Sequence, residues 1–332
     1  MLDDTGIVVI ARNEGERFRR CLASLQGAAK HIVYADSGSS DGSAEHARAE
    51  GAEVVVIEPP YNQPRGRNAG LRRLLELDPE LRYVFFLDGD CQLVPGFLQA
   101  AHAALEKDAG AAAACGRRLE LHPDASVYNK LVHMEWNTKV GEGDFGGDVL
   151  IRAEVVRALG GYRENMPAGE DMELSYRVRA AGHRVLRLPL DMTTHDVALA
   201  RFGSWWKRHG RGGQAFAHAM LLNWGSPERY GFRTCASILA HGAALPAACI
   251  ALAPPTLGAS LAVYLADSAR LAARVRRTRM REHGDNARDA SVYGAFVALG
   301  KVAEAQGVVE ALWKHLLGQR MHYVEYKDYQ EA

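Results

Sequence analysis

Cysteine is scarce in this chain, and its spacing excludes two classes of protein. Five cysteines occur in 332 residues, at Cys21, Cys91, Cys115, Cys235 and Cys249. They are odd in number, far apart and never in a C-x-x-C pair, which argues against a disulfide framework and against a structural zinc site. A reducing compartment fits this pattern best.

The chain also lacks a net charge and a leader-like N-terminus. Lys plus Arg and Asp plus Glu each total 40, so the formal net charge is zero, and the balance gives no sign of a nucleic-acid partner. The first residues, MLDDTGIVVI, lack the basic start and small-residue cleavage site of a signal peptide. We therefore expect a cytoplasmic protein, and 48% hydrophobic residues over this length allow a sizeable core.

Strands and helices alternate through the first 90 residues. Apolar runs predict strands at 6–11, 31–35, 54–57 and 82–87, and the segments between them predict helices at 16–25, 43–50 and 63–78. This alternation predicts an α/β fold, with a mostly parallel sheet and helices on both faces. In such sheets ligands bind beyond the carboxyl ends of the strands, where Arg12, Asp36 and Asp88 fall.

The pattern is looser after Arg117. We expect a helix at 94–105, a strand at 111–115, a strand followed by a helix within 149–159, a helix at 170–182, a strand at 183–188 and a helical tail from 291 to about 317. The chain after that tail is polar and aromatic.

The character of the chain changes near residue 199. Residues 199–232 mix aromatic and basic side chains, among them Trp205, Trp206, Arg208 and Arg211. Such a mixture suits a membrane interface or a lid over an anionic ligand. We therefore divide the chain into a domain at 1–198, this segment at 199–232, and a helical tail at 233–332 that is membrane-associated or packed on the rest.

Residues 234–266 contain no Asp, Glu, Lys or Arg. One spanning helix of roughly 20 residues would fit, but two crossings would be tight, and Pro246, Pro254 and Pro255 disfavour an uninterrupted helix. Arginines flank both ends, which places both flanks on the cytoplasmic side of a membrane. We expect a re-entrant or interfacial helical hairpin, with a buried helical pair packed on the first domain as the alternative.

Asp88-Gly89-Asp90 directly follows the apolar run RYVFFL. Two carboxylates one residue apart can face the same divalent ion, and Mg²⁺ or Mn²⁺ held in this way usually bridges to substrate phosphates. A solvated turn at a strand end is the alternative for an isolated triplet. Its neighbours in the sequence favour the metal site.

Four landmarks occur in a fixed order: VVIARNE, ADSGSSDGS, PRGRNAG ahead of LDGD, and PAGEDMELSYRVRAAG. With these motifs the chain resembles the family 2 glycosyltransferases over about residues 5–198. The resemblance implies an inverting enzyme of the GT-A fold that uses a nucleoside diphosphate sugar and Mg²⁺ or Mn²⁺.

The resemblance also assigns the donor and metal contacts. It implies that Asp36 accepts a hydrogen bond from the nucleotide base, and that Asp88 and Asp90 form the metal motif, with Asp88 also near ribose. The remaining residues that match donor-side or sugar-side segments of the family are Arg12, Asn13, Glu14, Arg65, Arg67, Asn68 and Asp148. His195 matches a further metal ligand of some relatives, although a lone histidine can also be structural.

Asp171 and Glu170 match the catalytic loop of the family. Inversion needs a carboxylate that deprotonates the acceptor while the nucleotide leaves from the opposite face, and the resemblance gives this role to Asp171. Glu170 would orient the acceptor or the loop. Acidic residues at a helix start also stabilise the helix through its dipole, which is the alternative interpretation.

These observations predict transfer of a sugar from a UDP, dTDP or GDP donor to a sugar or lipid-linked acceptor at the cytoplasmic face of the cell membrane. Cell-surface polysaccharide or glycolipid assembly is the expected pathway. One alternative is a nucleotidyltransferase, although VVIARNEGERF lacks its glycine-rich triphosphate loop. The other is a non-catalytic scaffold that binds sugar nucleotides, which would have no evident need for Asp171.

Overall fold

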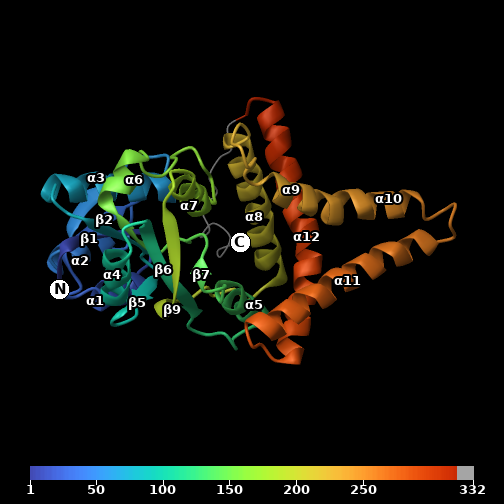
Figure 1. Ribbon diagram of the computed structural model, residues 1–332, viewed down its shortest axis with the longest axis horizontal. Coiled ribbons are helices and arrows are strands. Elements are labelled where there is room, and N and C mark those ends of the chain that lie inside the picture. Colours follow the sequence, from blue (N-terminus) through green and yellow to red (C-terminus); the bar gives the residue numbers. More distant parts are fainter. Residues whose placement is uncertain (320–332) are drawn as a thin grey trace. The chain divides into compact units, whose positions relative to one another are not determined.

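The computed structural model describes residues 1–319, and these residues group into two compact units (Figure 1). Unit 1 consists of residues 1–125, 135–165 and 170–198. Unit 2 consists of residues 126–134, 166–169 and the chain from 199 onwards. No sequence signal indicated that residues 126–134 and 166–169 belong to the second unit. The separation of 199–232 from the tail stays a prediction, and the polar end after residue 319 lies outside the described residues.

Unit 1 is built on one mixed, mostly parallel sheet in the order β3-β2-β1-β4-β8-β6-β9-β5, with β7 paired to β9. The strands are β1 (Leu2–Ala11), β2 (Ala29–Asp36), β3 (Glu53–Val56), β4 (Tyr83–Asp88), β5 (Cys91–Leu93), β6 (Ala111–Glu120), β7 (Gly141–Glu142), β8 (Val149–Arg152) and β9 (Arg184–His195). The neighbours of β1 are parallel to it, whereas β8 is antiparallel to both β4 and β6.

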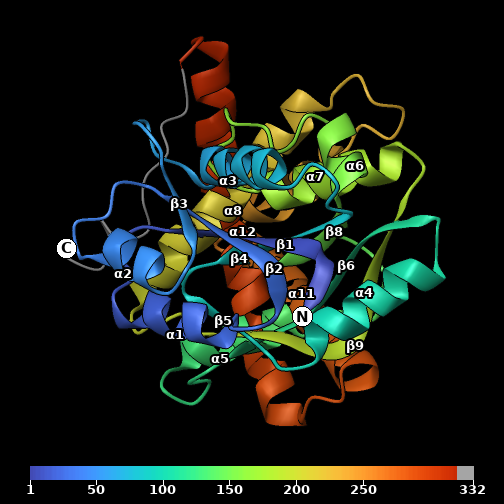
Figure 2. The same cartoon turned by 90° about the vertical axis from the view of Figure 1, so that its left-hand side faces the viewer.

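Helices cover the sheet of unit 1, as Figure 2 shows for α3, α4 and α1 around the strands. They are α1 (Glu16–Ser24), α2 (Ser43–Ala49), α3 (Gln63–Leu77), α4 (Phe97–Lys107), α6 (Ala153–Ala158) and α7 (Glu170–Ala180). Glycine lets α3 lie close to β1, because a Cβ at Gly70 would come within 2.3 Å of Val8. This approach brings the start of α3, with Arg67, to the carboxyl end of the sheet.

Several strands are longer than the sequence predicts, and β1 begins at Leu2 rather than Gly6. β6 extends to Glu120 rather than Cys115, and β9 extends to His195 rather than Leu188. The extensions of β6 and β9, GRRLE and PLDMTTH, mix polar and apolar residues, so no apolar run marks them. They form because the two strands pair with each other as far as Glu120 and His195, and the pairing of their backbones does not require apolar side chains.

Unit 2 is helical. Its elements are α5 (Val127–Trp136, up to Met134), α8 (Phe202–Leu222), α9 (Phe232–Leu239), the π-helical turn η1 (Ala240–Ala244), α10 (Leu245–Ala251), α11 (Ala259–Glu282) and α12 (Ala287–Leu316). Small residues and a few large ones fill its core, including Ala217, Cys235, Ile238 and Val308. Trp205 is 1% exposed and packs against Tyr128, Phe296 and His209.

Helices α9, η1 and α10 form a continuous 20-residue segment, Phe232–Ala251. Within residues 1–319 it is the one helix whose length and apolar composition would suffice to cross a bilayer. Pro246 does not end it, because the proline lies at the start of α10 after the π-helical turn. The helix ends at Ala251, before Pro254 and Pro255, and α11 returns beside α10 (Figure 1).

Candidate active site

Three strand ends bring the predicted nucleotide and metal residues to one edge of the sheet. In the parallel register Ala11 of β1 pairs with Asp36 of β2, and Ile10 pairs with Asp88 of β4. The two aspartates therefore flank the end of β1. This is the place that the alternation of strands and helices predicts for a ligand site.

Asp36 is 2% exposed and lies inside a loop network. Its Oδ1 accepts hydrogen bonds from the hydroxyl of Tyr34 at 2.7 Å and from the backbone N–H of Ser39 at 3.1 Å. Asn13, in a left-handed backbone conformation with φ of 50°, accepts from the N–H of Ser40 at 2.7 Å. The end of β1 and the loop after β2 are thus held together.

Arg12 and Glu14 flank this loop network. The guanidinium of Arg12 lies 4.8 Å from the ring centre of Tyr61, and Glu14 pairs with Arg17 at 2.9 Å. Both residues are chain neighbours of Asn13, and their contact with a nucleotide stays a prediction.

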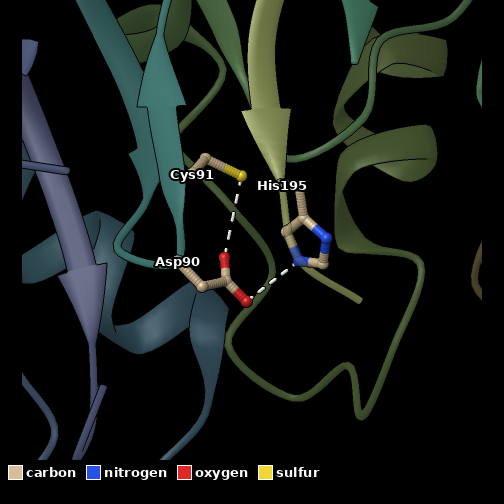
Figure 3. A group of neighbouring side chains, drawn as sticks. All are labelled: Asp90, Cys91 and His195. Atoms are coloured by element: carbon tan, nitrogen blue, oxygen red, sulfur yellow. Dashed lines mark hydrogen bonds and ion pairs between the residues drawn. The ribbon is translucent and has the colours of Figure 1, made fainter. Parts of the chain in front are cut away.

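Asp90 and His195 meet across the short β5–β9 pairing, in which Cys91 pairs with His195 (Figure 3). Nε2 of His195 lies 3.0 Å from Oδ2 of Asp90. Burial would raise the pKa of Asp90, but the adjacent His195 and then Arg118 hold it below its usual value. Burial would lower the pKa of His195, and Asp90 outweighs this and raises it. The strand pairing makes neighbours of residues that are far apart in the sequence.

The Asp90–His195 pair fits a divalent ion. Carboxylates suit Mg²⁺ and Mn²⁺, and imidazole is a common metal ligand, so Oδ2 of Asp90 and Nε2 of His195 would together hold the ion. The side chain of Asp90 is 25% exposed, so the pair is open to a ligand. The Cys91 thiol lies nearby, but burial raises its pKa, so it stays protonated and is a poor ligand for Mg²⁺ or Mn²⁺.

Arg118 and Asp148 hold Asp88 from one side. Arg118 contacts Oδ2 of Asp88 at 3.1 Å and both oxygens of Asp148, at 2.8 and 3.0 Å. Asp148 also accepts from the Asp88 backbone N–H and from Thr193. With an exposed fraction of 0%, Asp148 presents no surface to a sugar in this conformation, and the predicted sugar contact would require it to move.

Arg67 holds Asp88 from the other side and joins it to the acidic pair of α7. Its side chain is 2% exposed. Nη2 lies 2.7 Å from Oδ1 of Asp88, while Nη1 lies 2.5 Å from Oε1 of Glu170 and 3.3 Å from Oδ1 of Asp171. The ring of Tyr162 lies 5.3 Å from the guanidinium carbon. One guanidinium thus joins Asp88 of the predicted metal motif to the predicted catalytic pair of α7.

Asp171 lies in the first turn of α7, with Glu170 before it. Burial raises the pKa of the Asp171 carboxyl well above its usual value; Arg67 opposes this and Glu170 adds to it. Within the described residues, Oδ1 of Asp171 has the Arg67 ion pair but no hydrogen-bond donor in bonding geometry. A carboxylate with a raised pKa and an oxygen without a hydrogen bond is suited to accept a proton.

Asn68 and Arg65 have internal partners. Both amide hydrogens of Asn68 are used, on the carbonyl of Tyr162 at 2.8 Å and on Glu164 at 3.0 Å, and its oxygen accepts from the Tyr162 N–H. Arg65 donates to the carbonyl of Pro60 and faces Glu164 at 3.9 Å. Asn68 ties α3 to the turn before α7, and the donor contacts of both residues stay predictions.

Sequence reasoning missed Arg118, Thr193 and Tyr162 as parts of this site. Arg118 stands beside Arg117 in β6, and Arg117 instead pairs with Asp191. Neighbouring residues of a strand point to opposite faces of the sheet, so this pattern could have separated the two arginines. The pattern was not applied to them because the predicted strand ended at Cys115. For Thr193 and Tyr162 no local signal existed.

Residues 6–142 match the model of glycosyl transferase family 2. The expected resemblance to this family is confirmed. The chain is 28% identical over 188 residues to the succinoglycan biosynthesis protein ExoA of Rhizobium meliloti, covering 51% of this chain and 54% of that protein. It is 24% identical over 209 residues to the pre-mycofactocin glycosyltransferase of Mycobacterium tuberculosis, covering 58% and 43%. The chain thus spans about half the length of the curated relatives that it matches.

Solved structures confirm the GT-A fold of this chain. The mannosyltransferase PcManGT of Pyrobaculum calidifontis, solved with GDP-Man and Mn²⁺, superposes with a TM-score of 0.59 at 17% identity, covering 94% of this chain and 87% of that one. Residues 1–349 of TarS from S. aureus give a TM-score of 0.51 at 15% identity, covering 96% and 92%. At these identities the likeness shows the fold alone.

Proposed function

We propose that this chain is an inverting glycosyltransferase that moves a sugar from a nucleoside diphosphate sugar to a hydroxyl group of its acceptor. The observation that carries the proposal is the pair of contacts made by Arg67, which holds Asp171 and Asp88 on one guanidinium. These contacts support the proposal, because inversion needs a base for the acceptor close to a metal motif for the leaving diphosphate. A scaffold without turnover would not need this arrangement.

Asp171 accepts the proton of the acceptor hydroxyl as the new bond to the anomeric carbon forms. Glu170 is 6% exposed, and we assign it to orienting the loop through Arg67. Asp90 and His195, with Asp88 beside them, would hold Mg²⁺ or Mn²⁺, whose charge would stabilise the leaving diphosphate. Asp36 and Arg12 to Glu14 would contact the base and ribose.

The donor is a UDP, dTDP or GDP sugar, and the acceptor is a sugar or a lipid-linked sugar at the cytoplasmic face of the cell membrane. Support for this class comes from the relatives: one acts in succinoglycan biosynthesis, and one similar fold was solved with GDP-Man and Mn²⁺. Polysaccharide or glycolipid assembly is the pathway that we propose.

Thermal unfolding with UDP, dTDP and GDP sugars, each with and without Mn²⁺, tests donor and metal together, because a ligand that binds only the folded state raises its stability. We expect one nucleotide to raise the Tm in a metal-dependent manner. Asp90→Asn should abolish the shift and Asp171→Asn should keep it. No shift with any donor would overturn the proposal. A shift without release of nucleoside diphosphate over a panel of acceptors would favour the scaffold.

A further inference from the structure

Helices α10 and α11 form a hairpin whose tip exposes apolar side chains. Residues 245–266, which we call the tip, contain no charged residue. Six large apolar side chains of the tip are exposed: Ile250 (64%), Leu252 (53%), Leu257 (97%), Leu261 (41%), Val263 (57%) and Leu265 (66%). An exposed apolar surface of this extent marks an interaction site in a soluble protein.

The two helices of the tip are joined to each other. The Ser260 hydroxyl donates to the carbonyl of Cys249 at 2.6 Å, and Nδ1 of His241 lies 2.7 Å from Oδ2 of Asp267. These two contacts hold the hairpin together, and its apolar side chains extend from it. Figure 1 shows α10 and α11 converging toward the turn that joins them.

The first half of the apolar helix is fixed within unit 2. Cys235 and Ile238 lie in its core. A Cβ at Gly242 would come within 1.9 Å of the Lys301 carbonyl, so the backbones of η1 and α12 are in contact. Because this half is packed against α12, only the second half of the helix can enter a lipid bilayer. The 20-residue helix as a whole therefore cannot cross one.

The depth of the tip corresponds to one leaflet. The first charged residue after the turn is Asp267, and Ala259 to Asp267 rises about 12 Å along the helix at ~1.5 Å per residue. The hydrocarbon core of a bilayer is about 30 Å thick. The tip is therefore long enough for roughly half of that thickness, and the His241–Asp267 pair marks its polar boundary.

Arginines follow this boundary on one face of α11. Arg270, Arg274, Arg277 and Arg281 are all exposed. Their spacing of four, three and four residues places them in one row along the helix. A basic row directly behind an apolar tip is complementary to anionic lipid headgroups at the surface of a hydrocarbon phase.

We propose that the tip inserts into a single leaflet of an anionic bilayer and that Arg270 and Arg274 contact its headgroups. The chain is thereby held on one face of the membrane without spanning it. This inference does not depend on the transfer chemistry, because membrane binding can be measured without donor or acceptor.

Co-sedimentation with vesicles tests the insertion. The full chain should bind vesicles of phosphatidylcholine with 30% phosphatidylglycerol, and Ile250→Ser/Leu257→Ser/Leu265→Ser should lower the partition coefficient by about tenfold or more. Leu316→Ser is the matched control, because Leu316 is 77% exposed on α12, outside the tip, and it should bind like the wild type. Arg270→Gln/Arg274→Gln should lose most of the gain that phosphatidylglycerol gives over pure phosphatidylcholine.

Thiol labelling tests the depth. The native cysteines of the chain are all buried, so Leu257→Cys should be the rapidly labelled site for a membrane-impermeant maleimide in solution. With vesicles it should become protected against reagent outside and against reagent trapped in the lumen. Labelling from the lumen would show a spanning segment and overturn the single-leaflet arrangement.

The remaining outcomes also decide the proposal. Failure of the wild type to bind vesicles, or equal binding by the triple tip variant, would overturn it. If the wild type is instead a dimer by light scattering and the triple variant a monomer with no vesicle binding in either, the tip is an interface with a second copy.

Discussion

Nη1 of Arg67 lies 3.3 Å from Oδ1 of Asp171, and the same guanidinium contacts Asp88 at 2.7 Å through Nη2. From the family motif, Arg67 is expected beside the donor. The structure gives it three carboxylate partners inside the protein, so its main action is to position the two acidic motifs. Lysine could not reproduce this, because an ammonium group lacks the planar fork that contacts several carboxylates at fixed angles.

We expect Arg67→Lys to lower kcat by about 10-fold to 100-fold with a smaller change in the donor KM, since misplacing catalytic groups costs more than weakening a ground-state contact. Steady-state kinetics with the donor found by thermal unfolding would measure this. Arg72→Gln on the same helix is the control, because Arg72 is 65% exposed and forms an ion pair with Glu164; it should be close to wild type. A kcat unchanged in Arg67→Lys would contradict the positioning role.

Asp171→Asn should leave donor binding nearly intact and lower turnover by at least about 100-fold, because the amide cannot accept the acceptor proton. Titration calorimetry of the donor with Mn²⁺ and a turnover assay separate the two effects. Glu170→Gln should be milder, since that residue acts through Arg67. Comparable turnover in Asp171→Asn would remove Asp171 as the base.

The pH profile should carry the raised pKa of Asp171. Burial raises this pKa, and the base works only when deprotonated, so kcat should fall as the pH drops through a value above that of an ordinary aspartate. Arg67 lowers the pKa of Asp171; in Arg67→Gln the acid limb should therefore move to higher pH. Excess Mn²⁺ shows which residue causes the fall of kcat at low pH. It would shift the pH of this fall if His195 were the titrating group, and it would leave that pH unchanged if Asp171 were. If the fall of kcat at low pH occurs at the same pH in Arg67→Gln as in the wild type, the assignment of this fall to Asp171 is contradicted.

Gly147 and Gly146 offer a matched pair beside the ion network. A Cβ at Gly147 would lie 2.4 Å from Oδ2 of Asp88 and 3.0 Å from both Arg67 and Arg118, whereas a Cβ at Gly146 meets nothing within 4 Å. Gly147→Ala should displace Asp88 and lower kcat on the order of 100-fold, and Gly146→Ala should be close to wild type. Equal kinetics in the two variants would show that the network tolerates the displacement.

Gly213 and Gly212 test the packing of α8 on α12 in the same manner. A Cβ at Gly213 would come within 2.0 Å of the Glu304 carbonyl, while Gly212 faces open space. Alanine favours a helix by up to about 1 kcal/mol over glycine, so Gly212→Ala should raise the free energy of unfolding slightly. Gly213→Ala should lower it by about 1–3 kcal/mol, the cost of overpacking. Urea denaturation of both variants would show whether the free energy of unfolding rises in Gly212→Ala and falls in Gly213→Ala.

The sequence by itself determined the local parts of this protein. The apolar run at β4 and the two acids after it, the alternation that produces the parallel half of the sheet, and the uncharged stretch at 234–266 are all properties of neighbouring residues. Strand ends are the places where side chains leave the core, so Asp36, Asp88 and Asp90 were placed correctly at the edge of the sheet without knowledge of the tertiary structure.

Only the tertiary structure decided which of these residues meet. Asp90 reaches His195 through the β5–β9 pairing, and Asp171 reaches Asp88 through Arg67, across long stretches of chain. Arg118 joins the site because β6 continues beyond its apolar run. The uncharged segment predicted a helical hairpin, but the packing of η1 on α12 decided which part of that hairpin is exposed. Such contacts depend on backbone pairing and close approach between distant elements, which local residue patterns do not encode.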